Sequence, residues 1–290
     1  MNLKKITSKQ ITYAVRDLFT EAARILPDDI SLALEEALRK EESPIGKFVL
    51  SQLLENAKIA EEKGLPLCQD TGYAVVFIEW GSGVLFDGED LFKAVNEGVR
   101  MAYEEGYLRK SIVNDPLFDR KNTGDNTPCV LHLEMVEGEN VRIVVCPKGS
   151  GSENMSTIKM LKPADGLEGV KRFIIDVVER AGGNPCPPII LGVGIGGTME
   201  KAAYLSKKAL LRKIGEHNRE PRYAFLEREL LKEINNLGIG PMGFGGRITA
   251  LAVHIEYYPC HIASLPVAVN IQCHSARHKE AILSDFSDLR

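Results

Sequence analysis

The spacing of apolar residues changes once along this chain, and the change limits which folds are open to it. Up to residue 63, apolar residues recur every three or four positions, as in ITYAVRDLFTEAARIL, which is the period of an amphipathic helix. From residue 73 on, short apolar runs such as YAVVFIEW and PPIILGVG alternate with helical segments. We therefore expect an α/β protein of mixed α and β structure, in which a helical N-terminal layer, residues 1–63, precedes a mixed sheet with helices.

No internal repeat, low-complexity tract or linker interrupts the chain, so residues 1–290 are expected to form a single large domain. Two apolar runs, residues 128–138 and 140–147, are bounded by turn formers and are predicted to pair as antiparallel strands around Gly138. Two further strands, within residues 246–259 and 264–272, precede a predicted short C-terminal helix.

Composition and charge exclude several classes of function. With 290 residues, 44% of them hydrophobic and 26% charged, the chain is long enough to bury a substantial core. The formal net charge is −4 and basic residues are interspersed with acidic ones, so no nucleic-acid surface is expected. No apolar run approaches the roughly 20 residues that cross a bilayer, and no signal peptide is apparent. We expect a cytoplasmic protein with reduced cysteines.

Three glycine-rich stretches suggest ligand-binding loops. Residues 192–197, GVGIGG, match the dinucleotide fingerprint between a predicted strand and a predicted helix, which raises a dinucleotide-dependent oxidoreductase as an alternative. A dinucleotide-binding unit also needs a second strand that ends in an acidic residue about 20 positions after the glycines. The apolar pattern of this sequence predicts no such strand there. Residues 148–156 and 238–246 are similar in composition, and three such loops suggest an anionic ligand surrounded by backbone. Lys148 either adds charge to such a site or is simply solvated.

The six cysteines, at positions 68, 129, 146, 186, 260 and 273, differ in their surroundings. Cys129 and Cys146 lie within predicted strands and are expected in the core. Cys68, Cys186 and Cys273 stand beside turns at the ends of predicted strands, where a thiol can leave the core. From its local sequence Cys68 is a core residue, a nucleophile or a ligand, although the nearby Asp70 would raise the thiol pKa and disfavour a nucleophile.

A zinc site is a second alternative at the C-terminal end. Cys260, His261, Cys273, His274 and His278 have spacings that superficially match a Cys2His2 finger. A predicted strand fills the gap between the cysteines, where a finger would place a helix.

Five motifs together resemble one enzyme family. LCQDTG, KGSGSENMS, NPCPPIILGVGIGGTMEKA, GIGPMGFGG and PCHIASLPVAVNIQCHSARH resemble the class I iron–sulfur fumarate hydratase and L(+)-tartrate dehydratase family. The match is to the α subunit of the two-subunit form, which is equivalent to the N-terminal region of the single-chain enzymes. It covers the chain from about residue 45 to the end, in the expected order.

The resemblance implies a 4Fe–4S cluster with three cysteine ligands, which correspond to Cys68, Cys186 and Cys273. An iron without a cysteine ligand is open to substrate and can act as a Lewis acid. This chemistry suits removal of hydroxide from a 2-hydroxy acid while a positioned base takes a proton.

The same resemblance implies roles for other residues. Gln69, Asp70 and His261 correspond to catalytic residues. Arg109, and either Gly149 or Gly151, correspond to substrate-binding residues, since an arginine fork suits a carboxylate. Read without the resemblance, Asp70 caps a turn, Arg109 is solvated and His261 is a hydrogen-bonded surface residue.

The resemblance also implies partners. The single-chain enzymes continue into a second region with further arginines, a lysine and a threonine base, whereas this chain stops at Arg290. We therefore expect a separate β subunit to complete the site, with α–α association through the helical N-terminus. Hydration of fumarate to (S)-malate is the expected reaction, because it is a central metabolic activity; dehydration of L(+)-tartrate is the alternative.

Overall fold

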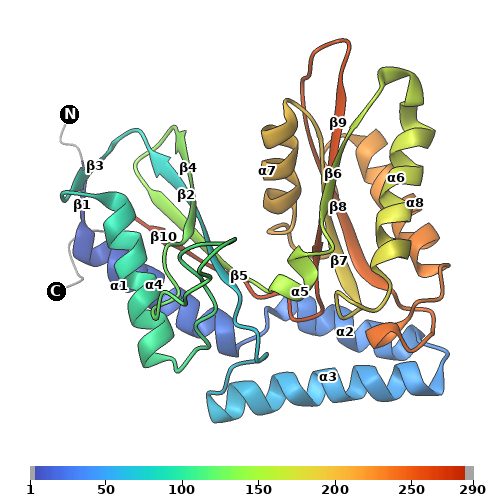
Figure 1. Ribbon diagram of the computed structural model, residues 1–290, viewed down its shortest axis with the longest axis horizontal. Coiled ribbons are helices and arrows are strands. Elements are labelled where there is room, and N and C mark those ends of the chain that lie inside the picture. Colours follow the sequence, from blue (N-terminus) through green and yellow to red (C-terminus); the bar gives the residue numbers. More distant parts are fainter. Residues whose placement is uncertain (1–3, 285–290) are drawn as a thin grey trace. The chain divides into compact units, whose positions relative to one another are not determined.

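Two separate hydrophobic cores organise this chain in the computed structural model, which describes residues 4–284 (Figure 1). Unit 1 comprises the described parts of Met1–Pro27, Ile59–Gly149 and Arg277–Arg290, and unit 2 comprises Asp28–Lys58 and Ser150–Ala276. The mixed α/β class is confirmed, and three helices occupy the predicted helical layer. The single domain over residues 1–290 stays a prediction.

Unit 1 is built from three stretches of the chain that are distant in sequence. Its elements are β1 (Lys4–Thr7), α1 (Ser8–Arg24), β2 (Tyr73–Gly81), β3 (Val84–Asp87), α4 (Leu91–Glu105), β4 (Val130–Val136), β5 (Val141–Lys148) and β10 (Lys279–Leu283). Helix α1 begins at a capping box, in which the Thr7 side chain accepts from the Gln10 N–H and the Gln10 side chain accepts from the Thr7 N–H. Apolar residues of α1 and α4, such as Phe19 and Val95, pack against Val76 and Ile143 of the sheet.

The four-stranded sheet of unit 1 has the order β10-β5-β2-β4. The predicted hairpin of residues 128–138 and 140–147 is therefore wrong, because β2 lies between β4 and β5. Ile78 of β2 is opposite Leu133 on one side, in parallel, and Ile143 on the other, antiparallel. Nearly all of β2 is buried, which suits a central strand, whereas β4 is half exposed and suits an edge.

The predicted C-terminal helix is also wrong over its described part. Residues 279–283 form β10, which pairs antiparallel with β5. These residues alternate between exposed and half-buried positions, as expected for a short edge strand. Residues 285–290 of the predicted helix lie outside the described residues.

Unit 2 holds a second four-stranded sheet, in the order β6-β9-β7-β8, with β7 and β8 parallel. Its elements are α2 (Asp28–Lys40), α5 (Ser150–Glu153), β6 (Thr157–Leu161), η1 (Pro163–Asp165), α6 (Gly166–Ala181), β7 (Ile189–Gly196), α7 (Met199–Ala209), α8 (Pro221–Asn235), η2 (Pro241–Gly243), β8 (Ala250–Tyr258) and β9 (Leu265–Gln272). Helix α3 (Pro44–Lys63) contributes residues to both units. Helices α6 and α8 share the apolar core with one face of the sheet, and α7 packs on the other face (Figure 1).

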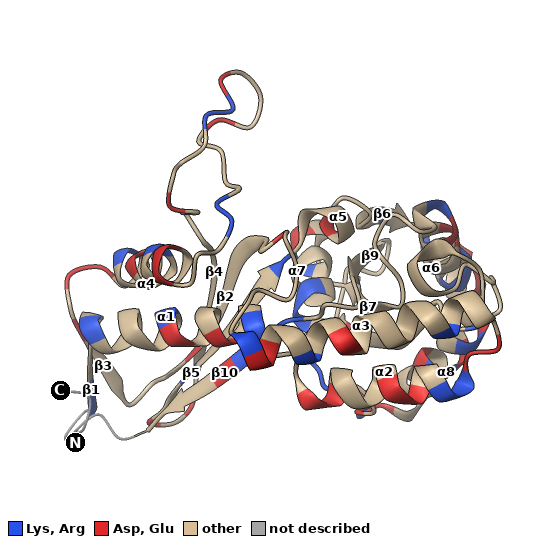
Figure 2. Cartoon of the chain, turned by 90° about the horizontal axis from the view of Figure 1, so that it is seen from below, with Lys and Arg blue, Asp and Glu red and all other residues tan. Residues whose placement is uncertain are grey.

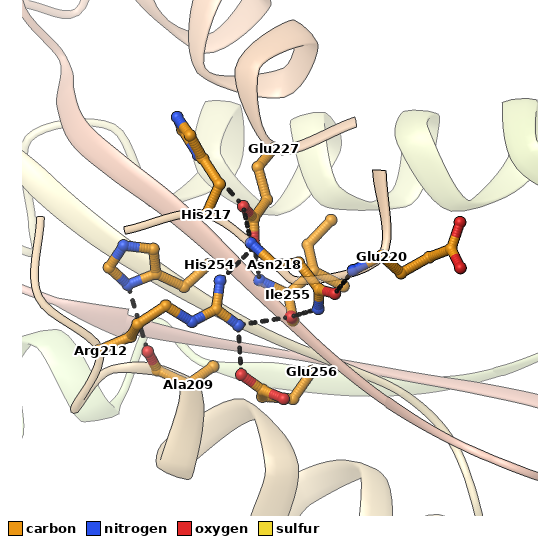
Figure 3. Close-up of polar contacts among 9 residues, drawn as sticks. All are labelled: Ala209, Arg212, His217, Asn218, Glu220, Glu227, His254, Ile255 and Glu256. Carbon is orange, nitrogen blue, oxygen red and sulfur yellow. Dashed lines mark hydrogen bonds and ion pairs between the residues drawn. The ribbon is translucent and has the colours of Figure 1, made fainter. Parts of the chain in front are cut away.

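A buried ionic network ties the segment after α7 to β8 and α8 (Figure 3). The carboxylate of Glu227, 1% exposed, accepts hydrogen bonds from Arg212 Nη1 at 2.5 Å and from the Ile255 N–H at 2.8 Å. Arg212 also pairs with Glu256, and Asn218 donates to the Ile255 carbonyl. The N–H and the carbonyl of Ile255, on β8, are thereby satisfied by side chains.

The surface carries mixed charge. Figure 2 shows Lys and Arg interspersed with Asp and Glu along the labelled helices. Among residues 4–284, no helix is long and apolar enough to cross a membrane.

Candidate functional site

The Cys68–Gly72 segment leads into β2 and is fixed at both ends. Before it, the Leu67 N–H donates to the Ala23 carbonyl at 2.8 Å. Within it, the Asp70 carboxylate accepts from the Gly72 N–H at 3.0 Å, which forms an Asx turn. Cys68 and Asp70 are partly exposed and Gln69 is exposed. The turn therefore presents the thiol and the carboxylate at the start of a buried strand.

Gly72 lets this turn lie directly against the end of β5. Its φ is +78°, and a Cβ built on it would lie 2.5 Å from the carbonyl carbon and oxygen of Lys148. Both the backbone conformation and the close approach exclude any larger residue.

Buried side chains hold the carbonyl groups of the turn. The Tyr103 hydroxyl donates to the carbonyls of Thr71 at 2.9 Å and Gly72 at 3.1 Å, and Asn126 donates to Gly72 at 3.1 Å. Burial raises the pKa of Tyr103 well above its usual range, so the hydroxyl stays a donor. The sequence marks Tyr103 only as an apolar position on a predicted helix. Its role in holding the turn was therefore not predicted.

Two buried cations lie beside the turn, and both Lys148 and Arg277 are 1% exposed. Arg277 donates from Nη2 to the Asp70 carbonyl oxygen at 2.8 Å, and Lys148 Nζ lies 3.5 Å from the Gly149 carbonyl oxygen. The alternative that Lys148 is simply solvated is wrong, because its side chain is buried at the end of β5. The Nε and Nη1 of Arg277 are buried without a hydrogen-bond partner among the described residues, so this part of unit 1 favours an anionic ligand.

Gly149 lies where the acidic and basic groups meet. A Cβ built on it would lie 3.3 Å from Asp70 Oδ2 and 4.0 Å from Arg277 Nη2. The lack of a side chain at Gly149 keeps this space open. Gly151, the other candidate, belongs to α5 in unit 2.

Arg109 is brought next to the turn through its backbone. The Thr71 hydroxyl donates to the Arg109 carbonyl at 2.7 Å, and the Arg109 side chain is exposed. Arg109 stands at the root of a long segment between α4 and β4, which Figure 2 shows extending away from both elements. The substrate contact of Arg109 stays a prediction.

In unit 2, Cys186 and Cys273 lie on neighbouring turns. His274, the residue after Cys273, donates to the Cys186 carbonyl from Nδ1 at 3.1 Å, and its backbone N–H lies 3.4 Å from the same oxygen. Cys186 has a φ of +58°, an uncommon backbone conformation for a non-glycine residue that is enriched at functional sites. These contacts bring two of the three predicted ligand positions together.

The glycine-rich stretch 238–246 supports the Cys186 turn. The Met242 N–H donates to the Pro187 carbonyl at 2.7 Å, and a Cβ built on Gly243 would lie 2.7 Å from the Gly183 Cα. Close backbone packing therefore explains Gly243 without a bound anion.

His261 lies in the exposed turn between β8 and β9. Its Nδ1 accepts from the Ala263 N–H at 3.1 Å. This bond requires an unprotonated Nδ1, so in the neutral ring Nε2 carries the proton and is available as a donor.

The chemistry of the cysteines fits the implied iron–sulfur group. None of the six forms a disulfide; Cys129 and Cys146 are buried as predicted, and burial raises the pKa of Cys129 to about 11. Cys68, Cys186 and Cys273 are each partly exposed, so these thiols can be reached by iron. Cys68 belongs to unit 1 and the other two to unit 2, and their assignment as ligands stays a prediction.

Two alternatives from the sequence lose support. GVGIGG lies largely inside β7, where a Cβ built on Gly194 would lie 2.0 Å from the Ala202 carbonyl oxygen of α7. These glycines serve helix–strand packing and do not form a phosphate-binding turn. Within residues 4–284, no three His, Cys, Asp or Glu side chains are gathered as a metal-ion site, so the zinc reading of residues 260–278 finds no support.

The fold and the site define an α/β protein with free cysteines on turns and buried cations beside one of them. A family model described as fumarate hydratase (Fumerase) matches residues 12–282, so the chain belongs to the fumarate hydratase family. A Methanocaldococcus jannaschii protein with the provisional name L(+)-tartrate dehydratase subunit alpha is 50% identical over 92% of this chain and 95% of its own length. The L(+)-tartrate dehydratase subunit alpha of Escherichia coli K12 is 33% identical over 99% of this chain and 94% of its own length. The relatives are thus hydro-lyases.

Proposed function

We propose that this chain is the α subunit of an iron–sulfur hydro-lyase that reversibly hydrates fumarate to (S)-malate. The observation that carries this proposal is the turn in unit 1, where a free cysteine and a carboxylate stand beside two buried cations. Buried Lys148 and Arg277 suit a negatively charged substrate, and the adjacent Cys68 suits a metal group. The cytoplasm, where thiols stay reduced, is the proposed compartment.

The proposed ligands are Cys68, Cys186 and Cys273. These cysteines would hold a 4Fe–4S cluster with one iron free of cysteine ligands, and that iron would supply Lewis acidity to the reaction. The remaining steps belong to side chains and backbone groups.

Hydration adds hydroxide to one alkene carbon and a proton to the other, so the site must hold two carboxylates and move one proton. We assign Arg109 and the backbone N–H of Gly149 or Gly151 to carboxylate binding. Asp70, held by the Gly72 N–H and close to Gly149, either transfers the proton or orients a base. Gln69 and His261 complete the assignment, with His261 donating from Nε2.

A separate β subunit is proposed to supply the rest of the site, since the relatives are themselves named as α subunits. Association of two α chains is proposed through the N-terminal helices, where α3 leaves Ile45 and Phe48 exposed.

Dehydration of L(+)-tartrate is the second candidate, and the names of the relatives favour it. Fumarate, malate and tartrate are small dicarboxylates that differ in their hydroxyl groups and in the alkene. The buried cations would serve each of them.

The test is reconstitution without oxygen of the α chain with its β subunit, iron and sulfide, followed by assays with fumarate, (S)-malate and L(+)-tartrate. We expect the mixture to hydrate fumarate and each chain alone to be inactive. A higher kcat/KM for tartrate would select the second candidate. Activity of the α chain alone would refute the shared site, and inactivity of a fully loaded complex toward all three acids would refute the proposed function.

A further inference from the structure

The charge of Arg277 supports the proposed function, but its hydrogen bond to the backbone of Asp70 has no part in that proposal. Arg277 follows Cys273 by four positions and immediately precedes the segment that leads into β10. Its Nη2 donates to the Asp70 carbonyl oxygen at 2.8 Å, so this hydrogen bond joins the segment before β10 to the Cys68–Gly72 turn.

The guanidinium is not saturated by this contact. Its Nε and Nη1 are buried and have no hydrogen-bond partner within the described part of the chain. A buried arginine that served packing alone would be expected to use most of its five donors. The cost of burying this charge points to a role at the turn rather than in the core.

The surroundings show what the charge acts on. The Asp70 carboxylate and Arg277 Nη2 border the same small space above Gly149, at 3.3 and 4.0 Å from a Cβ built there. The Asp70 carboxylate is oriented by the Gly72 N–H, and its carbonyl is held by Arg277 on the other side of the residue. Backbone and side chain of Asp70 are thus fixed by separate contacts.

We propose that Arg277 is a positioning residue, which fixes the backbone of Asp70 and thereby sets the carboxylate of Asp70 and the thiol of Cys68 in the geometry that the reaction needs. This inference rests on the proposed function for its kinetic consequence, but its structural consequence is independent. A lysine at position 277 can supply the positive charge but not the planar fork of donors. The contribution of the charge can therefore be separated from that of the guanidinium geometry.

The test compares Arg277→Gln and Arg277→Lys with Arg142→Gln. Arg142 lies on β5 and pairs with Glu79 and Glu280, so its replacement controls for the loss of a partly buried arginine of unit 1. Amide hydrogen exchange is followed by mass spectrometry in the full-length α chain without cluster. Steady-state kinetics and iron and sulfide content are measured on the reconstituted complex.

We expect Arg277→Gln to speed exchange in residues 65–72 by about tenfold, a local opening that leaves β7 unchanged. In the complex, kcat should fall by about 100-fold while KM changes by less than about threefold, as for a misplaced catalytic group. Arg277→Lys should recover part of both effects, and Arg142→Gln should show neither.

Equal exchange in Arg277→Gln and Arg142→Gln would overturn the inference. If Arg277→Gln unfolds unit 1 as a whole, Arg277→Lys decides: wild-type exchange in residues 65–72 of a folded Arg277→Lys protein also overturns it. A rise in KM with unchanged kcat would make Arg277 a substrate contact and would contradict the positioning role. If the wild-type complex has no hydro-lyase activity, the proposed function fails, whereas the exchange measurement still decides the role of Arg277.

Discussion

The carboxylate of Glu41 accepts a hydrogen bond from the backbone N–H of Ile248 at 2.8 Å, which joins the end of α2 to the segment that enters β8. Glu41 is 1% exposed and accepts three more backbone N–H groups, those of Glu42, Ser43 and Arg247. Burial opposes its ionisation, but the four N–H donors outweigh burial and lower its pKa. The Glu41 carboxylate thereby accepts from four backbone N–H groups of unit 2 that would otherwise need backbone carbonyls as acceptors.

Replacing this carboxylate should destabilise the protein. Glu41→Gln places an amide N–H₂ against backbone donors, and the free energy of unfolding at pH 7 should fall by about 2–3 kcal/mol. Because the folded-state pKa is lowered, this contribution is complete above the unfolded pKa of about 4.3 and is lost as the pH falls through the folded value. Urea unfolding at pH 7 and pH 4 measures both effects. The exposed Glu42→Gln should change stability by less than about 0.5 kcal/mol; a loss equal to that of Glu41→Gln would contradict the role given to Glu41.

Removal of one hydroxyl should loosen the Cys68–Gly72 turn. Tyr103→Phe leaves the ring in the core but removes the donor to the carbonyls of Thr71 and Gly72. The free energy of unfolding should fall by about 1–2 kcal/mol. Tyr107→Phe is the matched control, because Tyr107 is 90% exposed. Equal stability of the two variants would show that the Tyr103 hydroxyl does not hold the turn.

His254 should make stability depend on pH between about 4 and 6.5. Burial, reinforced by the Arg212 charge, lowers the pKa of His254 to about 4, and the ring donates from Nδ1 to the Ala209 carbonyl (Figure 3). The unfolded chain binds a proton in this range that the folded chain does not, so stability falls as the pH drops, by up to about 3 kcal/mol. His254→Asn removes the titrating group, and its unfolding free energy should vary less over the same range. A slope equal to that of the wild type would exclude His254 as its source.

A methyl group on Gly194 should disrupt the packing of α7 on β7. Its Cβ would lie 2.0 Å from the Ala202 carbonyl oxygen, so strand or helix must shift, and Gly194→Ala should cost about 2 kcal/mol of stability or more. Gly215→Ala meets no atom within 4 Å and carries only the strain of a φ of +94°, about 1 kcal/mol. Thermal unfolding ranks the two. A stable Gly194→Ala protein would contradict the packing explanation of GVGIGG.

The assignment of three cysteines as cluster ligands predicts which cysteine substitutions remove the visible absorption of the cluster. Protein reconstituted without oxygen should lose its visible absorption in Cys68→Ala, Cys186→Ala and Cys273→Ala, because each removes one ligand. Cys260→Ala, at an exposed thiol outside the assigned set, should keep the absorption and the iron content. An essential Cys260, or a coloured Cys186→Ala protein, would contradict the assignment.

Apolar periodicity predicted most elements of this fold because it reports which face of each element is buried. Helices α1–α3 and strands β7–β9 lie where their patterns indicated. Pairing between strands was not accessible in the same way. The β4 and β5 segments are neighbours in sequence, but β2 carries the more continuous apolar run and takes the central position between them.

The candidate site shows the same division. Cys68, Asp70 and Gly149 were predicted from short motifs, and the structure brings Asp70 and Gly149 together. Tyr103 and Arg277 were not assigned roles, because each acts on the turn through a contact across at least 30 positions of sequence. No local sequence pattern marks either residue, and both were recognised from their burial and their hydrogen bonds to the turn.

Unit 1 is built from segments that are synthesised both before and after unit 2, so its parts become available at different times. Unit 2 is complete once residue 276 has been made, whereas β10 and Arg277 of unit 1 are synthesised only after it. Until β10 has been synthesised, strand β5 has no partner on that edge of the sheet. The Cys68–Gly72 turn likewise lacks its hydrogen bond from Arg277 while unit 2 is being made. The contact between Arg277 and Asp70 therefore forms only after all of unit 2 has been synthesised.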